Sequence, residues 1–167
     1  MIIVCGLNTA PDLVFKHNVG AAIGILGPET KHPDFPSLSD AKRLRLSFND
    51  INAPADGMVA ANGDDASRLI HFIRCWDQKQ PLLIHCWAGI SRSTATAFAA
   101  LCILRPNRDE LEIAQELRAA SSSATPNRLI VLKIDEALGR NGRMLRAVES
   151  IGRGADAYAG TPFVLEV

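Results

Sequence analysis

Four runs of strand length, three of them apolar and one alternating between apolar and polar residues, are interspersed with segments of helical periodicity, and this pattern constrains the fold of the chain more than any other feature. The runs are short and bounded by turn or polar residues, as strands are; they cover residues 2–5, 20–26, 43–48 and 81–84. The other segments carry apolar residues at helical spacing or begin with helix-start residues; they cover residues 9–19, 66–78, 94–104, 107–120, 125–139 and 143–151. Strands alternating with helices predict an α/β fold, with a central, mostly parallel sheet flanked by helices on both faces. The whole chain, residues 1–167, is expected to be a single domain.

The charge balance excludes two classes of partner. Lys plus Arg number 18 and Asp plus Glu number 18, so the formal net charge is zero, whereas nucleic-acid binders and proteins of acidic membrane surfaces show a basic excess or stripe. No stretch approaches the roughly 20 apolar residues that span a bilayer. The first residues also lack the basic region of a signal peptide. We therefore expect no nucleic-acid partner and no membrane association.

The cysteines indicate neither a zinc site nor a redox pair. Cys5, Cys75, Cys86 and Cys102 form no Cys-x-x-Cys motif. Cys5 and Cys102 lie in apolar runs, and buried free thiols of this kind are typical of a reducing compartment, so we expect a cytoplasmic protein. His71 lies four residues before Cys75, but no further residues are spaced to complete a metal site. No metal and no cofactor are expected.

The segment from Leu83 to Thr94 carries the strongest chemical signal in the chain. An apolar strand ends at Cys86, a short loop with Gly89 follows, and Arg92 lies where the next helix begins. A strand–loop–helix of this kind directs backbone N–H groups and the positive end of the helix into one concavity, which binds anions. A thiol in such a site favours its charged form, and Arg92 adds a planar fork that can hold two phosphate oxygens. A nucleophilic sulfur in a phosphate-shaped cradle predicts phosphoryl transfer through a cysteinyl-phosphate intermediate.

This segment resembles the signature of a known enzyme family. His85-Cys86-x5-Arg92-Ser93 is similar to the signature of the cysteine-dependent protein tyrosine phosphatases, and HCWAGISRST is most similar to the dual-specificity subgroup. The similarity extends over roughly residues 43–142 and includes a Pro126-Asn127 pair. The resemblance implies a protein-tyrosine-phosphatase-like fold and a metal-independent phosphomonoester hydrolase. Its substrate would be a phosphorylated protein or a small phosphomonoester.

The resemblance also implies a role for each residue of the signature. Cys86 would be the nucleophile, and Arg92 would bind the phosphoryl group. Ser93 would donate its hydroxyl to the thiolate and ease its departure, and His85 would orient the cysteine, although a core histidine is the structural alternative. Asn127 would support the phosphate-binding loop, with a first-turn helix residue as the alternative. Backbone N–H groups would come from Trp87, Ala88, Gly89, Ile90 and Ser91.

The leaving group of a phosphomonoester needs a proton, since a tyrosine hydroxyl has a pKa of about 10 and alkoxides leave far less readily. The family takes this proton from an Asp upstream of the signature. Asp50 follows a strand 36 residues before Cys86, whereas the usual spacing is somewhat shorter and fits Asp56. Asp64 and Asp65 lie in the same predicted loop. We favour Asp50 because a residue at a strand end can be aimed; the others have a structural interpretation in turns and caps.

Two features of the signature bear on the substrate. Trp87 is a bulky residue directly after the nucleophile and would narrow or flatten the mouth of the pocket. No Lys-Asn-Arg-Tyr segment is present of the kind that deepens the pocket of large tyrosine-specific phosphatases. The pocket is therefore expected to be shallow, without strong selection for phosphotyrosine. The signature loop also lacks Lys, unlike lipid-directed relatives, which disfavours phosphoinositides.

Two other functions compete with hydrolysis. A catalytically silent module that binds phosphate or phosphoproteins would typically lose the cysteine, the arginine or the acid, and all three are present here. A sulfur-transfer enzyme with a similar cysteine loop is disfavoured by the Arg92-Ser93-Thr94 ending. A phosphatase assay would distinguish the silent binding module from a hydrolase, and turnover of thiosulfate would identify a sulfur-transfer enzyme.

Overall fold

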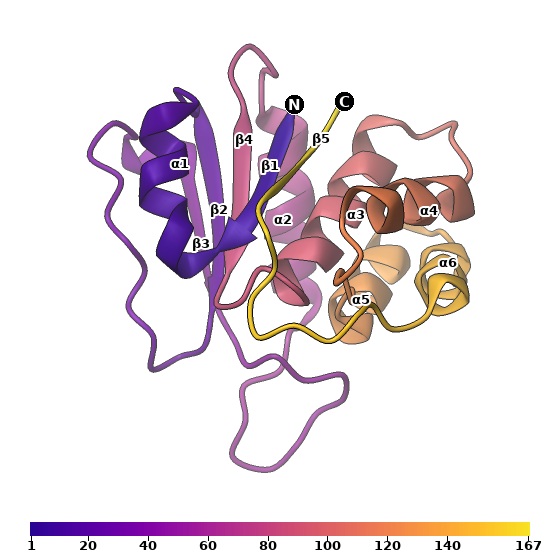
Figure 1. Cartoon of the computed structure of the whole chain (residues 1–167). Coiled ribbons are helices and arrows are strands. Elements are labelled where there is room, and N and C mark those ends of the chain that lie inside the picture. Colours follow the sequence, from indigo (N-terminus) through magenta and orange to yellow (C-terminus); the bar gives the residue numbers. More distant parts are fainter.

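The computed structural model describes residues 1–167, and its strands form one five-stranded sheet in the order β3-β2-β4-β1-β5 (Figure 1). Four strands pair in parallel, and the last pairs antiparallel with β1 at the edge of the sheet. Parallel neighbours need crossover connections, which helices and long loops provide here. The prediction of an α/β fold with a mostly parallel sheet is confirmed. The strands are β1 (Ile2–Gly6), β2 (Ala21–Leu26), β3 (Arg43–Ser47), β4 (Leu82–Cys86) and β5 (Phe163–Leu165).

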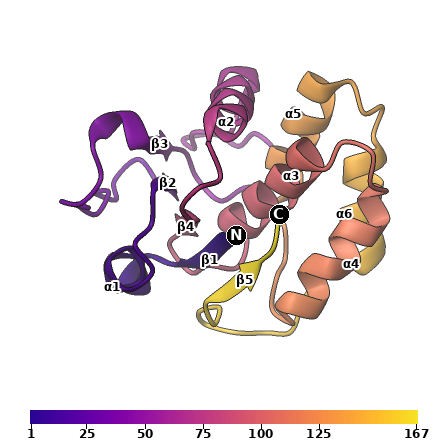
Figure 2. The same ribbon diagram turned by 90° about the horizontal axis from the view of Figure 1, so that it is seen from above.

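Helices cover both faces of the sheet, but unequally (Figure 2). One face carries α1 (Ala10–Lys16) and the loop between β2 and β3. The other face carries the remaining helices, among which α3 packs directly on the central strands. None of the helices combines the length and the apolar composition needed to cross a membrane. The helices on this second face are α2 (Gly63–Cys75), α3 (Arg92–Leu104), α4 (Glu110–Ala120), α5 (Arg128–Leu138) and α6 (Arg143–Ile151).

The central strands are apolar on both sides because each face of the sheet has its own core. Successive side chains of a strand point to opposite faces. In β1, Ile2 and Val4 belong to the large core under α2 to α6, whereas Ile3 and Cys5 belong to the smaller core under α1. Two-sided burial of this kind is what a parallel sheet between two helical layers requires.

The start of α2 differs from the sequence prediction. We predicted a loop to residue 65 and a helix from residue 66, but α2 begins at Gly63. The Asn62 side chain accepts the backbone N–H groups of Asp64 and Asp65, and the Asp65 carboxylate accepts the N–H of Asn62. This is a capping box, which starts the helix ahead of its first apolar residue. Asp64 and Asp65 therefore lie in the first turn of α2 and not in the loop.

Other predicted boundaries were also wrong. α4 begins at Glu110 and not at residue 107, because the Asp109 side chain caps the helix by accepting two backbone N–H groups. Thr9 does occupy the N-cap position of α1, but its hydroxyl donates to the Gly6 carbonyl and makes no capping hydrogen bond. α1 ends at Lys16 and α2 at Cys75, each about three residues early, and the backbone turns beyond both ends, where Asn18 and Gln78 have φ values of 47° and 59°. The C-terminal tail, which carries no clear pattern, forms β5 through its pairing with β1.

Candidate active site

Three segments meet at the carboxyl edge of the parallel strands (Figure 1). Cys86 is the last residue of β4, Asp50 lies three residues after the end of β3, and Arg92 is the first residue of α3. In open α/β sheets this edge is where binding sites form, because loops and helix N-termini converge there. The fold therefore brings together side chains that lie 42 positions apart, from Asp50 to Arg92.

The loop between β4 and α3 uses its carbonyls and its N–H groups differently. Four of its carbonyls accept backbone N–H groups of other segments: Trp87 from Leu7 (3.0 Å), Ala88 from Gly160 (2.8 Å), Ile90 from Thr125 (2.9 Å) and Ser91 from Asn127 (3.3 Å). The N–H groups of Trp87, Ala88, Ile90 and Ser91, in contrast, donate to no other protein group. Free N–H groups of a rigid loop at a helix N-terminus make an anion-binding cradle.

Gly89 is required at the centre of this loop. Its φ of +77° lies in the left-handed region, and a Cβ there would come within 2.7 Å of the Cys5 and Gly6 backbone. Any side chain would both strain the turn and push the loop away from β1. The backbone N–H of Gly89 donates to the Cys86 sulfur at 3.2 Å, so this glycine also positions the thiol.

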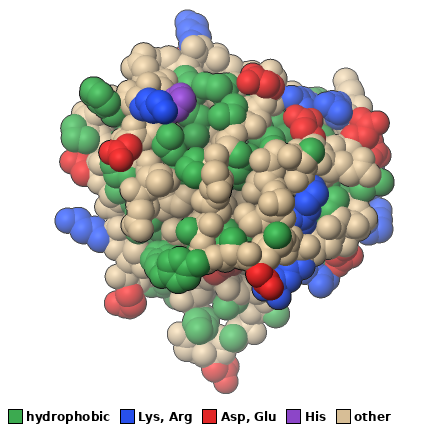
Figure 3. Space-filling model, viewed as in Figure 1, with side chains coloured by type: hydrophobic (Ala, Val, Ile, Leu, Met, Phe, Trp, Pro, Cys, Tyr) green, Lys and Arg blue, Asp and Glu red, His purple; other side chains and the backbone are tan.

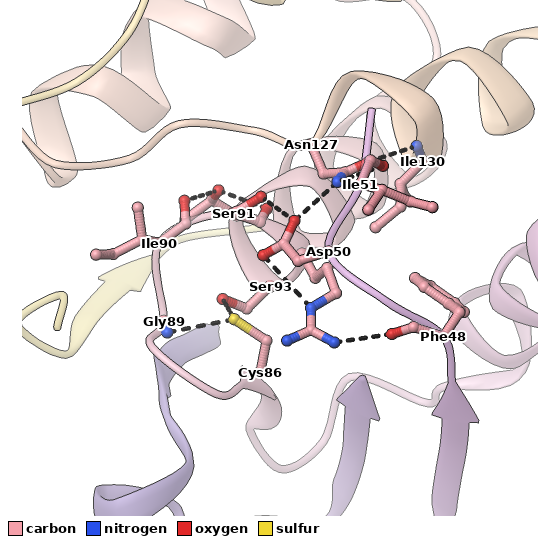
Figure 4. Close-up of polar contacts among 12 residues, drawn as sticks. Phe48, Asp50, Ile51, Cys86, Gly89, Ile90, Ser91, Ser93, Asn127 and Ile130 are labelled. Atoms are coloured by element: carbon pink, nitrogen blue, oxygen red, sulfur yellow. Dashed lines mark hydrogen bonds and ion pairs between the residues drawn. The ribbon is translucent and has the colours of Figure 1, made fainter. Parts of the chain in front are cut away.

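The Cys86 thiol lies at the floor of the cradle. It is 1% exposed, and the Ser93 hydroxyl lies 3.2 Å from Sγ (Figure 4). Ser93 is fully buried at the start of α3. A hydroxyl at this distance can donate to the sulfur when it is anionic. Sulfur, hydroxyl and the free N–H groups of the loop thus face one small region.

Arg92 is held in place from the end of β3. The side chain is buried, its Nη1 donates to the Phe48 carbonyl at 2.8 Å, and its Nε lies 3.5 Å from the Asp50 Oδ2. The Phe48 carbonyl is a partner that the sequence did not reveal. Because one guanidinium nitrogen is committed to the backbone, the orientation of the planar fork is set before any ligand binds.

Asp50 is anchored through one of its two carboxylate oxygens (Figure 4). Oδ1 accepts the Ser91 hydroxyl at 2.6 Å and the Asn127 amide at 2.8 Å, whereas Oδ2 faces Arg92. The structure thus joins Asp50 to the cradle. The other candidate carboxylates have no such contact with the loop. Asp56 is exposed in the loop after β3, and Asp64 and Asp65 lie in the first turn of α2.

Asn127 contacts both α5 and the candidate site, and it lies one residue before the first turn of the helix. It is the N-cap of α5, where its Oδ1 accepts the Ile130 N–H at 3.0 Å. Its amide nitrogen donates to Asp50 and to the Ile51 carbonyl, and its backbone N–H donates to Ser91. One buried side chain therefore ties α5 to the acid and to the loop.

The contact from the Ser91 hydroxyl to Asp50 was not predicted, because nothing local in the sequence distinguishes this serine.

His85 lies directly behind the thiol, in the smaller core. Its ring is buried and packs edge-on against His32 (6.5 Å between centroids) and Phe35 (5.9 Å), both from the loop after β2. Burial lowers the pKa of His85 from 6.5 to about 4, and burial likewise lowers the pKa of His32. Both rings are therefore neutral at pH 7.

We expect acid to destabilise the fold through His85. Between pH 6.5 and about 4 the unfolded chain binds a proton that the folded chain does not, so stability present above pH 6.5 is lost as the pH falls through this window. The loss amounts to roughly 3 kcal/mol, with His32 acting in the same direction.

Urea unfolding at pH 7 and pH 4.5 should show a smaller loss of the free energy of unfolding in His85→Gln than in the wild type. His71→Gln, at an exposed position of α2, is the matched control and should lose as much as the wild type; equal losses in all three proteins would contradict the prediction.

No metal cluster accompanies these residues. His71 Nε2 and Cys75 Sγ lie 3.7 Å apart on α2, but no group of three or more His, Cys, Asp or Glu side chains that could hold a metal ion forms anywhere in the structure.

No protein-family model and no curated protein matches the sequence, but solved structures match the fold. Human DUSP28 superimposes with a TM-score of 0.63 at 16% identity, covering 84% of this chain and 94% of that chain. A human tyrosine phosphatase-like serine/threonine/tyrosine-interacting protein gives 0.61 at 21% identity, with 84% and 92% covered. PTPMT1, solved in complex with PI(5)P, gives 0.61 at 16% identity, with 90% and 94% covered. At these identities the similarity shows the fold, which is that of the dual-specificity phosphatases.

Proposed function

We propose that this chain, which has the fold of the dual-specificity phosphatases, is a metal-independent phosphomonoester hydrolase acting through a cysteinyl-phosphate intermediate. The observation that carries the proposal is the loop after β4, where a buried thiol lies among backbone N–H groups without other partners and beside a pre-oriented arginine. A tetrahedral phosphoryl group matches this donor set in charge and in shape. The active unit is proposed to be the single domain formed by residues 1–167.

In the first chemical step the Cys86 thiolate attacks phosphorus, so that an S–P bond forms while the ester P–O bond breaks. The loop N–H groups and the Arg92 guanidinium bind the non-bridging oxygens, which carry the negative charge in the transition state. The leaving oxygen takes a proton from Asp50. Since Oδ1 of Asp50 is occupied by two donors, Oδ2 is the oxygen that would carry this proton.

In the second step a water molecule attacks the cysteinyl phosphate. The Asp50 carboxylate accepts the proton of the water, the S–P bond breaks, and inorganic phosphate leaves. The Ser93 hydroxyl, 3.2 Å from the sulfur, donates a hydrogen bond to the departing thiolate and so makes it a better leaving group. Ser91 and Asn127 hold Asp50 beside the loop through its Oδ1, so the same carboxyl group is in position for this step.

The test is detection of the intermediate together with turnover. The protein should release inorganic phosphate from para-nitrophenyl phosphate in the presence of a metal chelator. Rapid acid quenching during turnover should leave the mass of one phosphoryl group on the peptide that contains Cys86. Phosphate release that requires added metal, or a phosphoryl group on another residue, would contradict the mechanism.

Asp50→Asn should slow the hydrolysis of aryl phosphates with poor leaving groups by about a hundredfold, and that of aryl phosphates with good leaving groups far less. A leaving group that is already a weak base needs little protonation in the transition state. The variant should also lose the alkaline fall of the pH–rate profile, which reports loss of the proton of the acid. Asp56→Asn, in the exposed loop, is the matched control. If Asp56→Asn loses the alkaline limb and Asp50→Asn keeps it, the assignment of the acid is wrong.

A second candidate function is a module that binds phosphate or phosphoproteins without turnover. It is favoured by the contacts of Asp50: Oδ1 accepts two hydrogen bonds and Oδ2 faces Arg92, so both carboxylate oxygens already have protein groups beside them. The presence of thiol, arginine and acid together favours hydrolysis. Tight phosphopeptide binding with no phosphate release from any substrate would select the second candidate.

The cellular setting follows from the chemistry proposed. All four cysteines are free, and a cysteine nucleophile must stay reduced to act. A reducing compartment such as the cytoplasm meets this requirement.

A further inference from the structure

The phosphate-binding loop carries an aromatic pair on its outer side. Trp87, the residue after the nucleophile, is 49% exposed, and Tyr158 in the C-terminal tail is 85% exposed. Their ring centroids lie 5.8 Å apart at an interplanar angle of 77°, which is an edge-to-face contact. Tyr158 is the only tyrosine in the chain. The two rings together form an exposed apolar surface directly beside the residue that follows Cys86.

The tail that carries Tyr158 is fixed at both ends. Before the tyrosine, the Ala155 N–H donates to the Ser122 carbonyl at 2.9 Å and the Gly154 N–H donates to the Thr125 hydroxyl at 3.1 Å. After it, the Gly160 N–H donates to the Ala88 carbonyl at 2.8 Å, and β5 then pairs with β1. The tyrosine is therefore presented by an anchored bridge across the loop, so little order has to be gained when a ligand contacts it.

The other surroundings of the cradle are apolar or charge-paired. The loop after Asp50 exposes Met58 and Val59, and Val59 is hydrogen-bonded to Asn49, the neighbour of the candidate acid. Two arginines in segments that contact the loop already have partners: Arg128, next to Asn127, pairs with Glu149, and Arg153, next to Gly154, pairs with Asp156. Figure 3 shows a cluster of hydrophobic side chains at the lower left edge of the body, above the protruding loop, with acidic and basic groups further along the same edge. A ligand with a second phosphate would find no unpaired cation among these groups.

We propose that Trp87 and Tyr158 form an aromatic subsite that contacts the ring of an aryl phosphomonoester, such as a phosphotyrosine side chain, while its phosphoryl group occupies the cradle. The expected change in the kinetics rests on the proposed function, whereas the expected preference in binding does not require turnover. It revises the expectation of a pocket without selection for phosphotyrosine, because the second ring comes from a tail segment that the sequence left unplaced.

The physical basis is the preference of aromatic rings for one another. A third ring can pack edge-on or offset against the exposed faces of the pair, whereas the methyl group of phosphothreonine offers much less area. One additional aromatic contact is worth about a threefold to tenfold change in affinity. The subsite should therefore determine which phosphorylated side chain is preferred and leave the chemistry at phosphorus to the cradle.

The kinetic test compares two peptides of one sequence, carrying phosphotyrosine or phosphothreonine. In Tyr158→Ala and in Trp87→Ala the ratio of their kcat/KM values should fall about threefold to tenfold, through KM and not kcat for phosphotyrosine. Tyr158→Phe keeps the ring and should keep the ratio. Phe15→Ala removes another exposed aromatic ring, on α1, and should leave both activities unchanged. An unchanged ratio in both alanine variants would overturn the proposal.

The binding test separates this proposal from the proposed function. Calorimetry with the Cys86→Ser protein should show preferential binding of the phosphotyrosine peptide, with the preference reduced by Tyr158→Ala in the same background and retained by Tyr158→Phe. If the wild type turns over no substrate but this preference is present, hydrolysis is refuted and the aromatic subsite stands. If the two peptides bind equally, or if neither binds, the subsite is refuted whatever the activity.

Discussion

Replacing Cys86 with serine is expected to reduce turnover to below about one percent of the wild type while phosphate and vanadate still bind. The serine hydroxyl is a far weaker nucleophile than the thiolate and cannot form the cysteinyl phosphate. The cradle itself depends on the loop N–H groups and on Arg92, whose partners are the Phe48 carbonyl and Asp50. Steady-state assays with para-nitrophenyl phosphate and calorimetry with vanadate measure the two halves of the prediction.

The matched control for this variant is Cys102→Ser. Cys102 is also a free, buried thiol, but it lies within α3 and its pKa is raised to about 12, mainly by burial. It should remain as active as the wild type, apart from any loss of stability. Substantial turnover by Cys86→Ser would exclude a covalent thiolate mechanism, and loss of vanadate binding would mean that the thiol is needed to build the cradle.

Replacing Arg92 with lysine is expected to lower kcat/KM about a hundredfold or more, although the charge is kept. The guanidinium donates to the Phe48 carbonyl and retains further donors toward the cradle, whereas an ammonium group is a point charge that cannot make both sets of contacts in one plane. Kinetics on para-nitrophenyl phosphate measure the effect.

The control is Arg68→Lys, on the exposed side of α2, where the guanidinium makes only a long contact of 3.4 Å to the Arg45 carbonyl. It should keep wild-type activity. An Arg92→Lys protein within threefold of the wild type would show that Arg92 has a structural role, fixing α3 to the end of β3, and does not hold the substrate.

Short-range signals in the sequence predicted most of the fold. The apolar runs of β1 to β4 and the helical periodicity of α2 to α6 act through residues a few positions apart, so they can be recognised without the tertiary structure. The start of α2 was predicted too late because the apolar periodicity was used to place it. The helix begins at the capping box of Asn62, before its apolar face. The edge strand β5 has only three residues and depends on β1 for its hydrogen bonds.

The candidate site likewise has one part that nearby residues predict and another that depends on long-range contacts. Cys86, Gly89 and Arg92 lie within seven positions of one another, and their sequence alone indicates a thiol inside an anion cradle at a helix N-terminus. The choice of Asp50 over Asp56 stays a prediction, but the structure adds an argument that spacing could not supply. Ser91 and Asn127, 41 and 77 positions away, hold Asp50 beside the loop.

The order of strands and helices and the chemistry of one continuous loop could be predicted from the sequence, because both depend on neighbours along the chain. The packing of the fold was needed to establish which carboxylate faces that loop, which backbone carbonyl orients Arg92, and which aromatic residue joins Trp87. Each of these contacts joins segments 40 or more positions apart, as the separations of 44 for Phe48 and Arg92 and 77 for Asp50 and Asn127 illustrate. Such contacts are set by how the sheet and its two layers of helices pack, and no local propensity encodes them.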